Sequence, residues 1–528
     1  MFRHKNGMSG QHYMVEMTGS GVALLDYDND GDLDVFALQS GPLEKGRQPD
    51  PLRDPTSRLF RNDLQNGSLH FTDVTEQAGL GLASYAQGVA VADFDGDGFA
   101  DLYVTTFGRN HLFHNNGNGT FTDVTEQAGV ADSPAWHTCA TFIDYDRDGW
   151  PDLFVCRYLL WTLENHHTCT SSGGLVDYCG PQSYSPDRSR LYHNLGGGRF
   201  EDVSVASGIA GNAGSALGVL SADFNGDGWP DLFVANDGAA NFVWINQRNG
   251  TFREEGMLRG AALNGDGAAE ANMGVVAADF SNRGLLDLFV THLRNEHSTL
   301  WRNLGGGLYE DNTQLANLDA PTRPFTGFGT VAVDYDNDGW LDLFAANGDV
   351  HVIDEQARAG VQLPLRQRAM LLRNLGGDPP RFQEIVDGDF IKVKDVGRGV
   401  ASGDLNNDGA VDLVVANNNG PLRLLLNQAA GRAKWLGVRL TEGPAGHRHD
   451  ALGATATLHR TGRPSQFRRC GTDGSYLSAS DPRIVFGLGD SAAYDWIDVQ
   501  WADGLKERFT GVPTGRYSEL AKGHGQAQ

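Results

Sequence analysis

The sequence predicts an all-β protein, a seven-bladed β-propeller with calcium loops followed by a small C-terminal β domain. An acidic pattern of nine residues, first seen as DYDNDGDLD at 26–34, occurs seven times along the chain. Each copy lies between short runs rich in Val, Leu, Phe and Ala, which is typical of two strands joined by a turn. A second hairpin pattern with an Asn/Gly turn follows the first six copies. Four strands per repeat, at intervals of roughly 50 to 80 residues, predict the blades of a closed ring.

The acidic loop has the residue types of a calcium site. The copies begin at Asp26, Asp93, Asp144, Asp223, Asp279, Asp334 and Asp404. Calcium binds roughly six to eight oxygens, and acids at alternate loop positions point toward one centre. The glycine at position 6 permits the sharp turn. A metal-free acidic turn is the alternative for one copy, but seven copies in register favour calcium because unpaired carboxylates in one loop repel one another.

Six of the loops supply the predicted calcium ligands, which group by position in the loop. Position 1 has the carboxylates of Asp26, Asp93, Asp144, Asp223, Asp334 and Asp404. Position 3 has the side chains of Asp28, Asp95, Asp146, Asn225, Asp336 and Asn406. Position 5 has Asp30, Asp97, Asp148, Asp227, Asp338 and Asp408. Position 7 offers the backbone carbonyls of Asp32, Phe99, Trp150, Trp229, Trp340 and Ala410. Position 9 has Asp34, Asp101, Asp152, Asp231, Asp342 and Asp412.

The fifth copy, DFSNRGLLD, departs from the pattern. It places Ser281 and Arg283 where acids stand in the other copies. We therefore expect about six Ca²⁺ ions in the seven loops, with the loop at Asp279 empty and the Arg283 guanidinium in place of the ion.

The repeat pattern ends before the chain does. We expect the propeller to span 1–430, a separate small β domain 431–520 and a tail 521–528. The seventh repeat lacks its outer strand, so either Phe2–His4 or Trp435–Leu440 is expected to complete that edge. The second domain contains a polar, glycine-rich loop that brings together Tyr476, Ser478, Ser480 and Asp481. No histidine follows at a suggestive position, so these residues are interpreted as turn formers rather than a catalytic set.

Charge and hydropathy exclude some functions. The formal net charge is −25, and much of it lies in the loops. This acidity argues against nucleic acid as a partner, because phosphate binding needs a basic face. No apolar run is long enough for a membrane span. The opening MFRHKNGMSG lacks the apolar segment of a signal peptide.

The five cysteines point to one disulfide. Cys169 and Cys179 bracket a polar loop, as in proteins of oxidising compartments. Cys139 and Cys156 fall opposite each other across a predicted hairpin, and two buried thiols are the favoured interpretation. Cys470 has no evident partner. His166 and His167 beside Cys169 could bind zinc or copper, but without a second ligand pair a solvated loop is favoured.

The repeats resemble a known family. DYDNDG at 26–31 and DFDGDG at 93–98 are similar to FG-GAP/VCBS propeller repeats, as in integrin α heads. KWLGVRL, GSYLSASDPRIVFGLG and VQWADG look like an ASPIC/UnbV domain, and the pairing resembles bacterial relatives of the cartilage acidic protein group. Such relatives usually carry a leader upstream of the F-x-H-x-N-G seen at Phe2–Gly7. The resemblance therefore implies an extracellular or periplasmic protein, with a cytoplasmic one as the alternative.

Two functions follow as hypotheses. In the first, a calcium-binding propeller engages a protein, glycan or other ligand through the face that carries the long insertions 40–57, 156–189 and 347–369. The acidic loops are expected on the opposite face. A monomer is expected.

The alternative is a biosynthetic enzyme for a small-molecule substrate, of a non-redox cyclisation or group-transfer type. It is suggested by relatives near natural-product genes, with the active site in the propeller funnel. The candidate catalytic residues, on connections expected to ring the channel mouth, are Glu16, His137, Glu270, Arg323 and Arg398. An acid such as Glu16 or Glu270 would transfer protons, and an arginine would stabilise negative charge. The bland alternative is that Arg323 or Arg398 pairs with Asp395 or Glu270.

Overall fold

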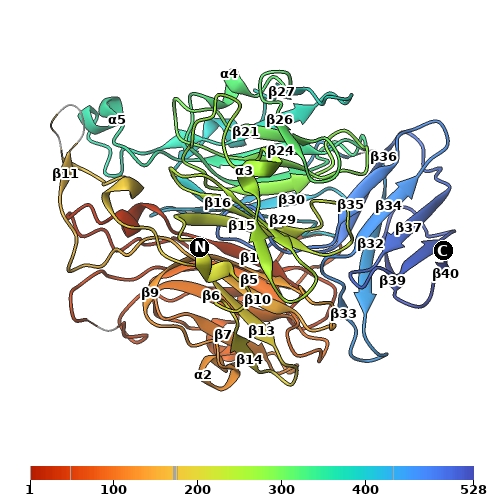
Figure 1. Ribbon diagram of the computed structural model, residues 1–528, viewed down its shortest axis with the longest axis horizontal. Coiled ribbons are helices and arrows are strands. Elements are labelled where there is room, and N and C mark those ends of the chain that lie inside the picture. Colours follow the sequence, from red (N-terminus) through yellow and green to blue (C-terminus); the bar gives the residue numbers. More distant parts are fainter. Residues whose placement is uncertain (1, 48, 171–173, 175, 432) are drawn as a thin grey trace.

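Seven consecutive antiparallel sheets make up most of the computed structural model, which describes residues 2–47, 49–170, 174, 176–431 and 433–528 (Figure 1). Blade 1 contains β1 (Val22–Leu25), β2 (Asp34–Ala37), β3 (Arg58–Asn62) and β4 (Phe71–Asp73). Blade 2 contains β5 (Ala86–Ala92), β6 (Asp101–Gly108), β7 (His111–Asn115) and β8 (Phe121–Asp123). Blade 3 contains β9 (Ala135–Ile143), β10 (Asp152–Arg157), β13 (Arg190–Asn194) and β14 (Phe200–Asp202). Pairing of β6 with β9 joins blades 2 and 3 into one sheet.

The remaining blades repeat this order. Blade 4 contains β15 (Ala216–Ala222), β16 (Asp231–Asn236), β17 (Phe242–Asn246) and β18 (Phe252–Glu254). Blade 5 contains β19 (Val275–Ala278), β20 (Asp287–Val290), β21 (Thr299–Asn303) and β22 (Tyr309–Asp311). Blade 6 contains β23 (Gly327–Val333), β24 (Asp342–Asn347), β26 (Met370–Asn374) and β27 (Phe382–Glu384). Blade 7 contains β29 (Gly397–Gly403), β30 (Asp412–Asn417) and β31 (Arg423–Leu425).

The first strands of the blades form a ring. Each contacts the next, in the order β1, β5, β9, β15, β19, β23, β29, and β29 returns to β1. An acidic loop joins the first strand of every blade to the second. The all-β propeller class is confirmed, and the count of sheets is consistent with seven blades.

The N-terminus lies against the short edge of blade 7. Arg3 forms an antiparallel bridge with Pro421, and His4 N donates to Gly420 O at 2.8 Å. Of the two expected closures, the segment Phe2–His4 is therefore the one observed. The stretch Trp435–Leu440 instead lies within β32 (Lys434–Glu442) of the C-terminal domain.

Helices are short, and those after the outer strands close turns. The α-helices are α1 (Thr75–Ala78), α2 (Thr125–Ala128), α3 (Gly256–Arg259), α4 (Asp319–Thr322) and α5 (Asp354–Arg358). The 3₁₀ turns are η1 (Met14–Met17), η2 (Pro181–Ser183), η3 (Ile209–Gly211) and η4 (Phe390–Lys392). Within the described ranges, none of the helices has the length and hydropathy to cross a membrane.

The long insertions carry two small strand pairs. Cys169–Thr170 (β11) pairs with Val176–Asp177 (β12), and Gln367–Arg368 (β25) pairs with Lys394–Asp395 (β28). The predicted disulfide between Cys169 and Cys179 is present. Cys139, Cys156 and Cys470 are free and buried, as expected.

The C-terminal domain is built from two sheets around one apolar core. The first contains β32, β33 (His449–Asp450), β36 (Ile484–Gly489) and β39 (Tyr517–Ala521). The second contains β34 (Thr455–His459), β35 (Gln466–Arg469), β37 (Trp496–Gln500), β38 (Lys506–Phe509) and β40 (Gln526–Ala527). Leu436, Phe486, Ile497 and Trp501 are among the buried core residues. The expected tail 521–528 is wrong, because β40 pairs with β38 and supplies an edge strand of the second sheet.

The acidic loops and the long insertions lie on opposite faces of the propeller, as predicted. Figure 1 shows the C-terminal domain in blue on one side, and α5 and β11 on the other. The C-terminal domain contacts the acidic loops directly, since His447 Nδ1 lies 3.1 Å from Asp97 O and Gly489 N donates to Asn337 O at 2.8 Å. It therefore covers part of the face on which calcium is expected.

Candidate metal centres

The loop of blade 2 shows how backbone amides hold the aspartates. Asp93 accepts hydrogen bonds from the amides of Gly96 at 2.7 Å and Gly98 at 2.7 Å. Asp101, at position 9, accepts from Phe94 N at 3.0 Å and from Asn115 N at 2.7 Å. The six complete loops repeat the bonds to the position-9 aspartate. The carboxylates are thus preorganised by the hairpin itself.

Position 3 has oxygens without partners. Oδ1 of Asp28, Asp95 and Asp336 is buried and has no hydrogen-bond partner among the described residues. Carboxylate oxygens of Asp95, Asp93 and Asp101 lie within 4.8 Å of one another, and those of blade 1 do the same. Orphaned buried oxygens are expensive unless a cation or donor satisfies them. The residues present therefore fit a calcium ion.

The position-9 aspartates are difficult to ionise without a cation. Burial raises the pKa of Asp34 to about 9 and that of Asp342 to about 9, with neighbouring loop carboxylates adding to the shift. Asp231 reaches about 8 for the same reasons. A divalent cation reverses this balance because it favours the charged carboxylate.

Histidines next to two loops were missed by the sequence analysis. His114 Nδ1 lies 3.2 Å from Asp95 Oδ2, and the hydrogen bond to Asp101 raises the His114 pKa to about 9. His193 Nδ1 lies 3.0 Å from Asp152 Oδ1. The signal was the histidine before the strand-ending asparagine in HLFHN and RLYHN. These side chains can shield the loops when protonated.

The fifth loop replaces the ion with a side chain. Arg283 Nη2 donates to Asp287 Oδ1, the position-9 carboxylate, at 3.0 Å. Asp279 accepts from the amides of Arg283 and Gly284, so the loop keeps the shape of the others. This geometry matches the predicted role of the guanidinium.

A left-handed asparagine at position 4 links neighbouring loops. Asn282 donates to Gly339 O at 3.1 Å and Asn337 to Gly409 O at 2.9 Å. Two more links, from Asn407 to Gly31 and from Asn29 to Gly98, continue the series to blade 2. The loops of blades 5, 6, 7, 1 and 2 are therefore one connected set.

The channel is closed from the side of the acidic loops. The loop 471–481 of the C-terminal domain enters it and contacts all seven first strands. Tyr476 is fully buried, and its hydroxyl donates to Thr18 O at 2.9 Å. Asp473 accepts from Ser221 N at 2.6 Å. The residues interpreted as turn formers thus plug the propeller.

The expectation of an open channel mouth ringed by the catalytic candidates is wrong. Glu16, His137, Glu270 and Arg398 are all buried, and only Arg323 is exposed. The N-terminal segment that contains Glu16 fills the channel from the insertion side and meets the plug at Thr18.

Each buried candidate has a structural partner. Ser9 hydrogen-bonds to Glu16, and Thr106 O lies 3.2 Å from His137 Nδ1. Burial opposes ionisation of Glu270, but the hydrogen bond and charge of His292 lower its pKa to about 2.

The two arginines do not pair as the bland alternative supposed. Arg398 donates to the carbonyls of Gly348 at 2.9 Å and Gly397 at 2.7 Å, and it stacks on Phe328. Arg323 pairs with Asp319 at 2.6 Å. Asp395 is held by Arg423 instead. The cluster at His166, His167 and Cys169 is not a thiolate site, because Cys169 is in the disulfide.

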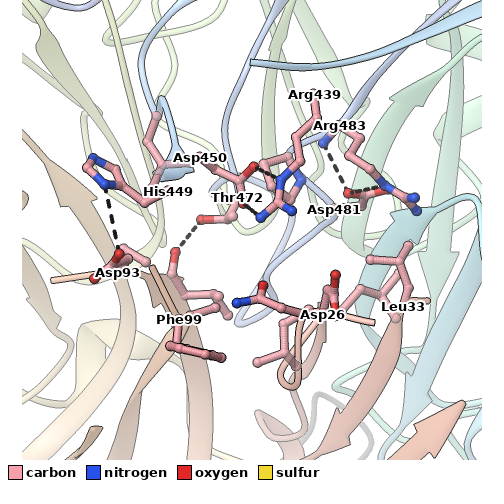
Figure 2. A pocket seen from close by; sticks show the side chains of 18 of the residues that line it. Asp26, Leu33, Asp93, Phe99, Arg439, His449, Asp450, Thr472, Asp481 and Arg483 are labelled. Carbon is pink, nitrogen blue, oxygen red and sulfur yellow. Dashed lines mark hydrogen bonds and ion pairs between the residues drawn. The ribbon is translucent and has the colours of Figure 1, made fainter. Parts of the chain in front are cut away.

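A cleft separates the C-terminal domain from the loops of blades 1 and 2 (Figure 2). Its volume is about 240 Å³. Arg439 pairs with Asp450 at 2.7 Å, and Arg483 with Asp481 at 2.9 Å. The two arginines that line this cleft are therefore compensated within the C-terminal domain.

Known proteins share both parts of this architecture. Residues 26–104, 93–155, 174–234, 223–290 and 279–345 match the FG-GAP-like repeat, which together cover more than half of the chain. This chain belongs to the FG-GAP-like repeat family. The C-terminal residues 443–527 of this FG-GAP-repeat protein match the ASPIC and UnbV domain, so the resemblance seen in the sequence is confirmed.

Cartilage acidic protein 1 is similar to this FG-GAP-repeat protein over most of its length. The mouse protein is 24% identical over 510 residues, covering 92% of this chain and 70% of the relative. The Xenopus tropicalis protein is 25% identical over 521 residues, with the same coverage of 92% and 70%.

Solved structures with similar folds include two lectins. An Agrocybe aegerita lectin that recognises non-reducing terminal N-acetylglucosamine has a TM-score of 0.42 and 16% identity, covering 78% of this chain and 95% of the lectin. The BP39L lectin from Burkholderia pseudomallei has a TM-score of 0.43 and 13% identity, covering 77% and 95%.

Proposed function

We propose that this protein is a calcium-stabilised propeller that binds a protein or glycan through the face of the long insertions. The observation that carries the calcium part is the set of buried, unpartnered Oδ1 atoms of Asp28, Asp95 and Asp336. Calcium would be held by positions 1, 3, 5, 7 and 9 of six loops. It would neutralise carboxylates that now raise one another's pKa values.

The ligand part rests on the surface of the insertions. They form the face opposite the C-terminal domain, as α5 and β11 show in Figure 1. Leu52 and Leu160, from two different insertions, are exposed large apolar side chains. Long loops on a rigid scaffold are a common location for binding residues. The Cys169–Cys179 disulfide braces one of these loops and supports an extracellular or periplasmic location.

The enzyme alternative gains no comparable support. Four of its five candidate residues are buried in structural contacts. The channel that would hold a substrate is filled by Tyr476 and its neighbours. The binding function is therefore the one that the geometry favours.

Native mass spectrometry tests the calcium part. Protein loaded with calcium and then stripped by a chelator should differ by about six calcium masses, one for each complete loop. Retention of no calcium would contradict the proposal.

A glycan array and matrix-protein panel, probed with the calcium-loaded protein, test the ligand part. The double variant Leu52→Asp, Leu160→Asp should keep the calcium count and lose the ligand, because both residues are exposed on the insertions. Unchanged binding by this variant would argue against the insertion face.

A further inference from the structure

A second cleft between the two domains lies beside the acidic loops of blades 3 and 4. Its volume is about 530 Å³, within the range of roughly 300 to 1,000 Å³ that small-molecule sites occupy. Arg147 and Asp223 line it from the propeller, and Arg469, Trp501 and Lys506 line it from the C-terminal domain. Interfaces between domains are a common place for such sites.

The cleft exists because the C-terminal domain sits unevenly on the loops. Arg468 Nη2 donates to Gly339 O of blade 6 at 3.2 Å, and Arg483 Nη2 donates to Asp404 O of blade 7 at 3.0 Å. His447 reaches the loop of blade 2. In contrast, the described residues of loops 144–152 and 223–231 receive no hydrogen bond from the C-terminal domain. These two loops therefore face the open cleft.

Arg147 breaks the rule that the other loops follow. It occupies position 4, where four loops have the asparagine that links them to a neighbour. Its φ is +62°, a conformation that asparagine adopts more easily than arginine. A residue that departs from the local pattern without a structural gain is a candidate for function.

The guanidinium of Arg147 has no acceptor. It stacks over the Trp229 ring at 4.6 Å. Its Nε is buried without a hydrogen-bond partner, and no ion pair to it occurs among the described residues. Asp503, whose negative charge it senses, is already paired with Lys522 at 3.0 Å. Stacking therefore holds a planar cation in place with its donors unused.

The other arginines around the two clefts are already paired. Arg469 is paired with Asp473, while Arg439 and Arg483 of the first cleft are paired with Asp450 and Asp481. Arg147 therefore stands out as the guanidinium left available for a ligand.

We propose that this second cleft binds a carboxylate-bearing polyhydroxy compound, such as a sugar acid, with Arg147 as its anchor. A stacked guanidinium presents parallel N–H donors that match the two oxygens of a carboxylate. Gln500 and Thr455 in the wall offer neutral groups for hydroxyls. The site rests on the proposed function, because calcium in the loops of Asp144 and Asp223 must neutralise acids that would otherwise repel an anion.

The test compares D-glucuronate with D-glucose by saturation-transfer NMR in excess calcium. The two sugars share a ring and differ at the carboxylate, so wild-type protein should bind glucuronate and not glucose. The variant Arg147→Asn should bind glucuronate at least ten-fold more weakly. Asparagine is the residue of four other loops at this position, so the variant should fold and keep its calcium. Arg323→Asn, a change at an exposed arginine outside the cleft, is the matched control and should bind as wild type.

The outcomes separate this site from the calcium proposal. Equal glucuronate binding by wild type and Arg147→Asn would overturn the site. Calcium binding without any glucuronate binding would also overturn it and leave the proposed function intact. Glucuronate binding through Arg147 in a protein that binds no calcium would support the site and remove the proposed function. Inorganic phosphate competing as well as glucuronate would contradict the selectivity for a carboxylate.

Discussion

At the scale of single residues, the loops combine bound and unbound carboxylate oxygens. Backbone amides hold the aspartates at positions 1 and 9, whereas position 3 has no partner in three loops. The position-3 side chain is therefore the one whose removal separates metal binding from the shape of the hairpin.

Replacing Asp95 by alanine should lower stability only when calcium is present. A site saturated at about 100 times its Kd contributes about 2.7 kcal/mol, which the variant would lose in large part. Thermal unfolding with and without a chelator measures the difference. Ser281→Ala is the matched control, because Ser281 occupies position 3 of the fifth loop. An equal loss for Asp95→Ala in chelator would rule out metal at that loop.

The position-9 aspartates should make calcium-free protein less stable as pH rises. Asp34 has a folded pKa of about 9 against an ordinary value of 3.8, so the folded state binds more protons between these two values. Stability must then fall as pH increases through this window. The unfolding temperature of stripped protein should drop between pH 5 and pH 8, by roughly a few degrees. Calcium-loaded protein should not show this fall, and a parallel fall in both forms would contradict the assignment.

At the scale of elements, the plug determines which residues the first strands can carry. Leu477 and Ser478 press against strand glycines in the channel. A Cβ on Gly21 would lie 1.9 Å from Leu477 O, and one on Gly399 would lie 2.4 Å from Ser478 Oγ. Glycine is required there for close approach of two backbones, not for a turn.

Gly21→Ala should therefore loosen the plug. Overpacking of this kind costs about 1–3 kcal/mol, and the loop 471–481 should become accessible to limited proteolysis. Gly211→Ala is the matched control, since a Cβ there meets no atom within 4 Å. Protease resistance unchanged from wild type in Gly21→Ala would show that the channel does not hold the loop tightly.

At the scale of the whole molecule, the second domain and the acidic loops form one interface. Gly489 N donates to Asn337 O, and Tyr517 reaches Asp404, both within loops where calcium is proposed. Metal removal should therefore be felt in the C-terminal domain as well as in the loops.

Hydrogen exchange should report this coupling. Stripping calcium should raise amide exchange in β36 and in the loop 471–481, because the carbonyls and carboxylates that anchor them would lose their fixed positions. The outer strands β13 and β14, far from the interface in sequence and in blade order, serve as the internal control. Exchange that changes only within the nine-residue loops would contradict the coupling.

Sequence reasoning succeeded where the determinants are local. The acidic loops, the hairpins, the Cys169–Cys179 disulfide and the second β domain follow from spacing, turn chemistry and composition within short windows. Even the substitution of Arg283 for an acid could be interpreted, because its partner Asp287 is four residues away. The candidate histidine His114 could have been found in the same way.

Only the tertiary structure decided how the two domains use each other. Tyr476 meets Thr18 across more than 450 residues of chain, so no local pattern announces that the channel is filled. The same holds for the burial of Glu16 and Arg398 and for the strand that β40 adds to its sheet. The sequence by itself determined the repeats and their acidic loops, because periodicity is written residue by residue. Contacts between distant segments determined which of these surfaces remain open.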